Sequence, residues 1–299
     1  MNEAERTEAG IPPDWHLQLF QKSVLKKAKL REIAGLLGPV DGKVCLDIGG
    51  DNGVISYHLR QLGGTWHSVD LTDKAVEAIR KLVGERVERI TGPKLPFQDG
   101  FFDVIVIVDL LEHLQEDDQF VAECHRCLKP AGRLIVNVPH IKRWAFVPPI
   151  RRLLGLTDER HGHVRPGYTA TQLFDLLKDG FDMESAHTYS RFFVQSLDVL
   201  IQMAIRRAVQ NDAPDAKGVV MDEARFEKTK RLFRVYSILY PFFQVAEVLD
   251  HLLFFTKGYN LIARARRRQW RPRRTPVLAD GRSIAEAALG GKIGTAAPF

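Results

Sequence analysis

The sequence predicts an α/β domain in which helices cover both faces of a mostly parallel sheet. The first observation is the alternation of short apolar strands with amphipathic helices over residues 43–138, the pattern of right-handed crossover connections. The second is the run Val104–Val108, which is typical of a strand buried on both faces. The third is residues 44–56, where a strand, a glycine-bearing turn and a helix start follow one another.

The turn within residues 44–56 (VCLDIGGDNGVIS) begins after Asp47 and contains Gly49, Gly50 and Gly53. Such a turn binds nucleotide-like ligands in doubly wound folds, because a ligand can approach a backbone that lacks Cβ atoms. Nicotinamide-dependent enzymes space their glycines as G-x-G-x-x-G, and these glycines do not match that spacing. The turn therefore indicates a nucleotide-like ligand and disfavours a nicotinamide enzyme.

The helices are predicted from apolar residues that recur every three or four positions and from the glycines and prolines that end them. The first helix ends at Gly38-Pro39 and is expected to cover the ligand pocket or one sheet edge. Thr169 or Thr171 is suited to cap the last one. The expected helices cover residues 15–37, 53–62, 73–83, 117–128 and 169–177.

The strands are predicted from short apolar, β-branched runs bounded by acids, prolines or glycines. The expected strands cover residues 43–47, 65–70, 85–90, 104–108, 133–138, 183–189 and 258–265. Asp47, Asp70 and Asp109 close three of them. Because parallel strands end at the same edge of a sheet, we expect the carboxylates of Asp47 and Asp70 at the ligand-binding edge. The carboxylate of Asp70 suits a ribose, since it can accept two hydrogen bonds from a cis-diol.

Mostly apolar helical stretches, at residues 192–209 and 225–255, lie between the last two strands. Polar residues interrupt both stretches, so neither offers the roughly twenty clean apolar residues of a membrane span. Two interpretations remain open. One is a helical hairpin packed on the sheet edge, and the other is a lid whose aromatic face lines an acceptor pocket or touches a membrane surface.

Charge and cysteine content narrow the class of protein. Arg264–Arg274 carries most of the net charge of +6 and is predicted to be a solvated tail, which either attracts phosphates of nucleic acid or lipid or only aids solubility. The N-terminal MNEAERTEAG is polar and acidic, unlike a secretory signal. Cys124 and Cys127 are interpreted as packing residues of a helix rather than as a metal or redox pair. A cytoplasmic setting is therefore expected.

Five segments together resemble the class I S-adenosylmethionine-dependent methyltransferases, in particular the small-molecule subgroup. Their order and spacing carry the resemblance. It implies a doubly wound, seven-stranded sheet whose last strand is antiparallel, with S-adenosylmethionine as the cofactor. The segments are LDIGGDNG (46–53), VDL (69–71), LPFQDGFFDVIVIVDLLEHL (95–114), LKPAGRLIVNVP (128–139) and HVRPGYTATQLFDLLKDGF (163–181).

The resemblance also implies roles for individual residues. Asp47 and Gly49 would shape the pocket for the methionine end of the cofactor. Asp70 would hold the ribose hydroxyls, Leu71 would pack on the adenine, and Asp109 would face the methionine portion or the acceptor. The implied cofactor-binding residues are Asp47, Gly49, Asp51, Gly53, Asp70, Leu71 and Asp109.

The sequence departs from the family pattern in three places. Asp51 replaces a glycine of the turn, where its side chain would either crowd the methionine group or pair with its ammonium. Gly92-Pro93-Lys94 stands where relatives often have an acid for the adenine amino group. The helical insertion separates two strands that usually form a hairpin.

A general base for an oxygen nucleophile is sought among the histidines, because imidazole titrates near neutrality. The candidates are His113, His140 and His163, with His161 as a further one. A structural or surface role is the alternative for each. The group Asp109-x-x-Glu112-His113 resembles one in ubiquinone-pathway O-methyltransferases, which there can bind a divalent cation. We predict no metal site, and oxygen, nitrogen and carbon nucleophiles all remain open.

The sequence thus predicts an N-terminal helical segment (1–38), a methyltransferase domain (39–190 with 257–270), a helical insertion (191–256) and a basic, low-complexity tail (271–299). The predicted activity is methyl transfer to a small or amphipathic acceptor, with a lipid-linked acceptor as a candidate. The alternatives are a non-catalytic binding module with the same fold and a nucleic-acid methyltransferase, nucleic acid being the less favoured partner. The expected location is the cytoplasm, with the anionic inner membrane face as a candidate docking surface.

Overall fold

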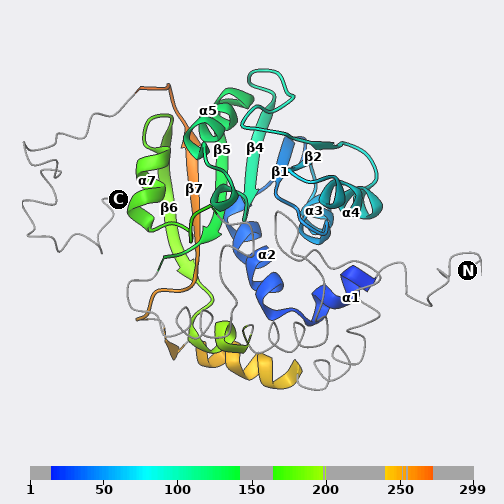
Figure 1. The fold of residues 1–299 in the computed structure, drawn as a ribbon, viewed down its shortest axis with the longest axis vertical. Helices are drawn as coiled ribbons and strands as arrows, with labels where there is room; N and C mark the ends of the chain where they lie inside the picture. The colour runs from blue at the N-terminus through cyan, green and yellow to red at the C-terminus, as the bar shows by residue number, and fades with distance from the viewer. Residues whose placement is uncertain are drawn as a thin grey trace, which may run out of the picture.

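The computed structural model describes residues 15–141, 164–197, 199, 240–250, 252, 253 and 255–271. Helices and strands alternate through most of the chain (Figure 1). The elements are α1 (Trp15–Lys22), α2 (Val24–Leu37), β1 (Val44–Ile48), α3 (Val54–Arg60), β2 (Thr65–Asp70), α4 (Asp73–Val83), β3 (Val87–Arg89), β4 (Phe102–Val108), the 3₁₀ turn η2 (Leu111–His113), α5 (Asp117–Cys127), β5 (Leu128–Pro139), α7 (Ala170–Leu177), β6 (Phe181–Tyr189) and β7 (Asn260–Arg267).

The strands form one 7-stranded sheet in the order β3-β2-β1-β4-β5-β7-β6. Strands β1 to β5 pair in parallel, and β7 is antiparallel to both β5 and β6. The predicted doubly wound sheet with an antiparallel last strand is therefore confirmed. Residues 192–197 and 240–250 are helical and lie between β6 and β7 in the chain, in agreement with the predicted helical insertion.

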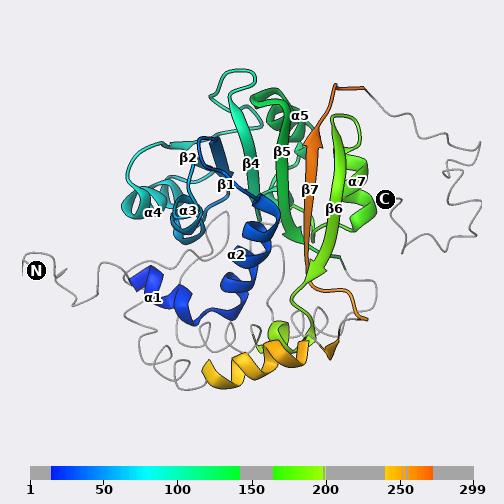
Figure 2. The ribbon, with the colours of Figure 1, turned by 180° about the vertical axis from the view of Figure 1, so that it is seen from behind.

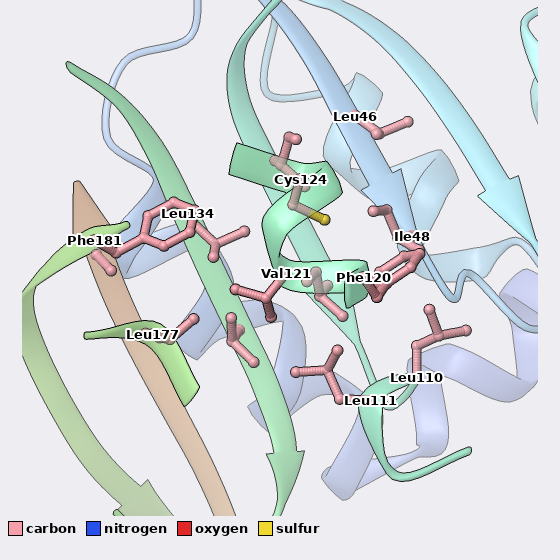
Figure 3. Close-up of a cluster of buried hydrophobic side chains, with 14 of the residues drawn as sticks. Leu46, Ile48, Leu110, Leu111, Phe120, Val121, Cys124, Leu134, Leu177 and Phe181 are labelled. Carbon is pink, nitrogen blue, oxygen red and sulfur yellow. The ribbon is translucent and has the colours of Figure 1, made fainter. Parts of the chain in front are cut away.

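Strand β4 is buried on both faces of the sheet, because its side chains alternate between two apolar cores. Ile105 and Ile107 enter the core that the sheet shares with α5 and α7. Figure 3 shows this core, in which Phe120 of α5 and Leu177 of α7 face the strands. Val104 and Val106 enter the second core, with α2 and α3. The predicted doubly buried strand is thus confirmed.

The three cysteines are free thiols in the interior. Cys45 faces the core under α2, and Cys124 and Cys127 belong to the core under α5. Burial raises the pKa of the Cys45 thiol to about 12 and that of Cys127 to about 11. A thiol that stays protonated is a poor nucleophile and a poor metal ligand, so the predicted packing role is confirmed.

The first helix of the sequence prediction is in fact two helices. Ser23 separates α1 from α2 with φ −87° and ψ 104°, and its hydroxyl accepts a hydrogen bond from the Lys26 N–H at 3.3 Å. Serine bonds nearby backbone donors well outside a helix, which favours a cap over a continuous helix. The single-helix prediction is therefore wrong at this point. Thr169, in contrast, is the predicted N-cap of α7 and exchanges hydrogen bonds with Gln172.

The basic block Arg264–Arg274 is not a solvated tail over its described part. Arg264 and Arg266 lie on β7, and both guanidinium groups pair with Glu184 of β6, at 2.7 and 2.6 Å. Sheet pairing and these ion pairs occupy the arginines within the fold. The prediction of a solvated tail is therefore wrong for the part of the block that lies in β7. The expectation that this part attracts phosphates of nucleic acid or lipid is no longer supported.

The described parts of the insertion pack on α2. Phe243 and Val24 belong to one small apolar cluster. Arg31 pairs with Glu247 at 2.9 Å, and the Lys27 ammonium donates to the Tyr240 hydroxyl at 3.0 Å. Figures 1 and 2 both show the helix at residues 240–250 (gold) lying beyond one end of the sheet, alongside α2.

Asp250 joins the two described ends of the insertion. Its carboxylate is buried and accepts the backbone N–H groups of Arg191 and Phe193, both at 2.7 Å, where the helical residues 192–197 begin. A carboxylate is a strong N-cap because it satisfies donors that have no partner within the helix. Burial raises the pKa of Asp250, and these N–H groups oppose that effect.

His67 on β2 makes the stability of the fold dependent on pH. Its ring contacts Phe97, Phe101 and Phe102 at centroid distances of 5.5, 5.5 and 5.6 Å. Burial, with a contribution from nearby arginines, lowers the pKa of this imidazole. The neutral form is therefore favoured on folding. This stabilisation is fully present above the unfolded pKa of about 6.5 and is lost as the pH falls through the lower folded pKa.

We expect His67→Gln to reduce the loss of thermal stability on acidification. The measurement is the thermal unfolding midpoint at about pH 7.5 and at about pH 5.5 in both proteins. The contributions of all other titrating groups are the same in both and cancel when the two proteins are compared. The difference between the two midpoints should be smaller in the variant than in the wild type. Equal differences would show that His67 contributes nothing to the acid sensitivity.

Candidate functional site

The glycine-bearing turn that connects β1 to α3 is pressed against its neighbours. Gly49 has φ +88°, and a Cβ there would lie 2.2 Å from the carbonyl oxygen of Val108. Gly53 has φ +79° and caps α3, and its Cβ would lie 2.7 Å from the Cα of Ile79. The packing of the protein itself therefore requires glycine at both positions, independently of any ligand.

The carboxylate of Asp47 holds this turn from the sheet side. Asp47 is buried and accepts hydrogen bonds from the Ser56 hydroxyl at 2.5 Å, the Ser68 hydroxyl at 2.8 Å and the Arg60 guanidinium at 3.3 Å. Burial raises the pKa of Asp47, and the three donors oppose that effect. Sequence reasoning missed these partners, although the spacing of Ser56 and Arg60 places both on one helix face.

Asp70 meets the turn from the end of β2. Its carboxylate is buried and accepts the backbone N–H of Asp51 at 3.3 Å and that of Leu71 at 2.7 Å. The structure therefore brings Asp51, Asp70 and Leu71 together at the edge where the parallel strands end, as the sequence predicted. The part that each plays in binding a ligand stays a prediction.

Asp109 follows β4 at the same edge. Its φ of +45° is a left-handed conformation, which aspartate tolerates better than most residues. One carboxylate oxygen accepts a hydrogen bond from Asn137 Nδ2 at 2.7 Å, and the other pairs with the Lys29 ammonium. Asn137 Oδ1 in turn accepts from the Tyr189 hydroxyl at 2.5 Å. Asp109 thus joins three strands and α2.

Helix α2 contributes two lysines that sequence reasoning did not select. Lys29 pairs with Asp109, and Lys26, one turn earlier, lies within the electrostatic reach of Asp51 and Asp109. Burial lowers the pKa of Lys26. Burial also opposes the charged form of Lys29, but the carboxylates of Asp109, Glu112 and Asp51 together raise the pKa of Lys29. The Lys26 ammonium has no hydrogen bond or ion pair to any described residue. The sequence could have identified them by their spacing, because two lysines three residues apart share one face of a helix that was expected to cover the pocket.

The candidate bases lie in different settings. His113 belongs to η2, shortly after Asp109, and is partly exposed. His140 is buried, and its Nδ1 lies 2.8 Å from the carbonyl oxygen of Gly258, which assigns the proton to Nδ1. His161 and His163 lie outside the described residues. Of the predicted bases among the described residues, His113 is partly exposed and lies on the short turn that follows β4.

The acidic group after β4 does not form a helical face. The short 3₁₀ turn η2 follows β4 in place of the first turn of an α-helix, so Asp109, Glu112 and His113 do not share one face at α-helical spacing. Within the described ranges of the chain, no cluster of three or more His, Cys, Asp or Glu side chains is arranged to hold a metal ion.

Residues 46–136 match the family model described as a methyltransferase domain. This region contains the turn, Asp70 and Asp109, and the sheet that carries it has the antiparallel last strand that the resemblance implied. Residues 46–136 therefore form a methyltransferase domain. The cofactor of the methyltransferase domain is S-adenosylmethionine.

Relatives of this methyltransferase match it over its central part. The demethylmenaquinone methyltransferase of Tropheryma whipplei is 32% identical over 136 residues, which cover 44% of this chain and 56% of that protein. The ubiquinone biosynthesis O-methyltransferase of Thiobacillus denitrificans is 30% identical over 100 residues, which cover 31% of this chain and 43% of that protein. The chain thus spans about half the length of the curated relatives it matches.

A solved structure shares the fold over a longer stretch. The S-adenosylmethionine-dependent methyltransferase of Thermotoga maritima aligns with a TM-score of 0.53 and 16% identity, over 85% of this chain and 96% of that one. At this identity the likeness concerns the fold alone. It agrees with the sheet order and with helices on both faces.

We expect Asp51→Gly to retain cofactor binding. Asp51 has φ +52°, a conformation that glycine adopts without strain, and its backbone N–H to Asp70 remains in the variant. Affinity for S-adenosylmethionine should stay within about threefold of the wild type, since roughly tenfold corresponds to one lost hydrogen bond. Isothermal titration calorimetry measures it. A much larger loss would mean that the Asp51 carboxylate pairs with the ligand rather than being a tolerated departure.

Proposed function

We propose that this methyltransferase transfers the methyl group of S-adenosylmethionine to a small, amphipathic acceptor of the quinone type. The observation that carries the proposal is the polar edge at the ends of β1, β2 and β4, where Asp51, Asp70 and Asp109 come together beside α2. The names of two relatives, a demethylmenaquinone methyltransferase and a ubiquinone biosynthesis O-methyltransferase, support the acceptor class.

The side chains of this edge fit the chemistry of the cofactor. The Asp70 carboxylate lies at the end of β2 and can accept two hydrogen bonds from a cis-diol, which suits ribose hydroxyls. The carboxylate of Asp109 suits the positive charges of the methionine end. The Lys26 ammonium, which has no ion-pair partner among the described residues, suits the cofactor carboxylate. Leu71 is partly buried and suits the adenine face.

When bound, the cofactor supplies an activated methyl group. The residues of the chain then need to orient the acceptor in line with that methyl group, keep water out and take a proton from a hydroxyl nucleophile. We assign the proton acceptor to His113, because it is partly exposed and follows Asp109 on η2. His140 is less suited, since Gly258 fixes its Nδ1 in the interior. Helix α2 covers the edge.

The test measures formation of S-adenosylhomocysteine from S-adenosylmethionine, with a water-soluble catechol and a short-chain demethylmenaquinol as probes. The wild type should turn over one of them, and His113→Gln should lower turnover about a hundredfold while cofactor affinity stays unchanged. Binding of the cofactor without turnover of either probe would contradict the quinone-type acceptor. Calorimetry without any heat of cofactor binding would overturn methyl transfer and favour the non-catalytic binding module.

A second part of the proposal is that the insertion places the enzyme on a membrane surface, where amphipathic acceptors partition. The helix at residues 240–250 and the turn after it expose large apolar side chains at helical spacing. These side chains are Phe242 (68% exposed), Val245 (56%), Val248 (64%), Leu249 (36%), Leu252 (64%) and Phe255 (74%). The charged groups of that helix point elsewhere, Glu247 to Arg31 and Asp250 to backbone N–H groups. An uncharged aromatic and aliphatic face of this kind suits the interface of a bilayer.

The membrane part is tested by co-sedimentation with phosphatidylcholine and phosphatidylglycerol vesicles at low salt. None of the described helices is long and apolar enough to cross a membrane, so binding is expected to be peripheral and reversible. The double substitution Phe242→Ser and Phe255→Ser should abolish sedimentation. Leu62→Ser is the matched control, because Leu62 is 44% exposed at the end of α3. Wild-type protein that ignores these vesicles would contradict membrane docking.

A further inference from the structure

A chain of hydrogen bonds between buried residues leads from β6 through β5 to Asp109. It runs from the Tyr189 hydroxyl to Asn137 Oδ1 at 2.5 Å and from Asn137 Nδ2 to the Asp109 carboxylate at 2.7 Å. We propose that Tyr189 and Asn137 are positioning residues, which hold the Asp109 carboxylate in one orientation. The inference rests on the proposed function for the ligand that Asp109 serves.

Asn137 is well placed to fix Asp109. It lies on β5, is fully buried, and its carbonyl oxygen accepts the Asp109 N–H at 2.9 Å. The same residue therefore holds both the backbone and the side chain of Asp109. The amide can serve the carboxylate only with its NH₂ group, which leaves Oδ1 pointing away. A buried Oδ1 needs a donor, and the Tyr189 hydroxyl provides it.

Tyr189 reaches Asn137 across an intervening strand. It ends β6, whereas Asn137 lies on β5, and β7 runs between them. The chain entering β7 passes very close, because a Cβ at Gly258 would lie 2.0 Å from the Tyr189 carbonyl oxygen. Burial, followed by the charge of Asp109, raises the pKa of Tyr189 far above neutrality. The hydroxyl therefore remains a donor at every physiological pH.

The consequence is a carboxylate with one oxygen committed to the sheet and the other directed to α2. In this structure the second oxygen pairs with Lys29. The arrangement aims the Asp109 carboxylate at cations on the α2 side, whether from the protein or from a bound ligand. The charged or titratable groups that act on Asp109 or on its lysine partner are Lys26 and Lys29 of α2, Tyr189 of β6, Asp51 of the turn and Glu112 of η2.

The first test is Asn137→Asp in the cofactor-free protein. The substitution places a second carboxylate against Asp109, and two such groups cannot both be ionised without a large penalty. Carboxyl ¹³C NMR should show the two carboxyl groups of the variant sharing a proton near neutral pH. An unchanged Asp109 titration in this variant would overturn the proposal, since it would place the two side chains apart.

The second test is Tyr189→Phe, measured by calorimetry with S-adenosylhomocysteine. Removal of the donor leaves Asn137 Oδ1 without a partner and frees the amide, so affinity should fall roughly tenfold. Tyr57→Phe is the matched control, because the Tyr57 hydroxyl makes no hydrogen bond to a described residue. It should bind like the wild type. In Asn137→Asp, affinity should in addition depend on pH between about pH 6 and about pH 8, a readout that a purely structural role would not change.

The outcomes separate the two proposals. Suppose that the wild type binds S-adenosylhomocysteine, that Tyr189→Phe and Tyr57→Phe bind it equally well, and that the affinity of Asn137→Asp does not depend on pH. These results would overturn the positioning role and would leave the proposal of methyl transfer intact. Wild-type protein that binds no S-adenosylhomocysteine would overturn the proposed function, and the NMR titration would then decide the positioning role on its own.

Discussion

Asp70→Asn is expected to weaken binding of S-adenosylhomocysteine by a factor of about one hundred or more. The two oxygens of Asp70 accept separate backbone N–H groups, from Asp51 and from Leu71. An amide must turn its NH₂ group toward one of these donors, so the turn and the end of β2 separate. The variant also loses the charge that a ribose diol would bond, and each charge-assisted hydrogen bond contributes roughly 1.5–3 kcal/mol. Isothermal titration calorimetry on the purified variant measures the loss.

The control for this variant is Asp73→Asn, three residues away. The Asp73 carboxylate is 79% exposed and pairs with Arg89 at 2.6 Å, and exposed pairs of this kind contribute little. It should bind the ligand like the wild type. Circular dichroism on both variants shows whether the fold persists. If Asp70→Asn is folded and keeps full affinity, the assignment of the ribose to Asp70 is wrong.

The sequence was sufficient for those parts of the site that local chain geometry determines. Parallel strands end at one edge of a sheet, so Asp47 and Asp70, which lie at the ends of two neighbouring strands, could be placed together without any structure. The alternation in β4 and the Thr169 cap follow from side-chain periodicity and from short-range hydrogen bonding. In each case the deciding contacts lie within a few residues of the chain or repeat with the period of the strand.

The parts that were missed depend on contacts between distant elements. Lys29 meets Asp109 across 80 residues because of the angle at which α2 crosses the strand ends, and no periodicity encodes that angle. Tyr189 meets Asn137 over an intervening strand, which follows from the pairing of β6 with β7. The same pairing explains the error about the basic block, because Glu184 opposite Arg264 turns a charge run into part of a sheet.

The role of the glycines also changed once packing was known. In the sequence, Gly49 indicated room for a ligand. In the structure, the nearest obstacle to a side chain is the Val108 carbonyl oxygen of the neighbouring strand. The turn is therefore shaped first by the fit of β1 against β4, and the same fit positions Asp47 of β1.

Gly49→Ala should consequently destabilise the whole domain. The new methyl group would lie 2.2 Å from a backbone oxygen, and φ +88° is strained for any residue with a Cβ. Overpacking and strain together suggest a loss of about 2–4 kcal/mol, a large share of the roughly 5–15 kcal/mol by which domains are stable. We expect a much lower unfolding midpoint in urea, measured by tryptophan fluorescence.

Gly35→Ala tests the same argument with the opposite sign. Gly35 lies inside α2, and no atom lies within 4 Å of a Cβ placed there. Alanine should therefore stabilise the protein by about 0.5–1 kcal/mol, because it lowers the entropy lost on helix formation.

If Gly49→Ala unfolded at the wild-type urea concentration, the turn would have to move away from Val108 at little cost. The acids of the site would then be held by their own hydrogen bonds rather than by the packing of β1 on β4.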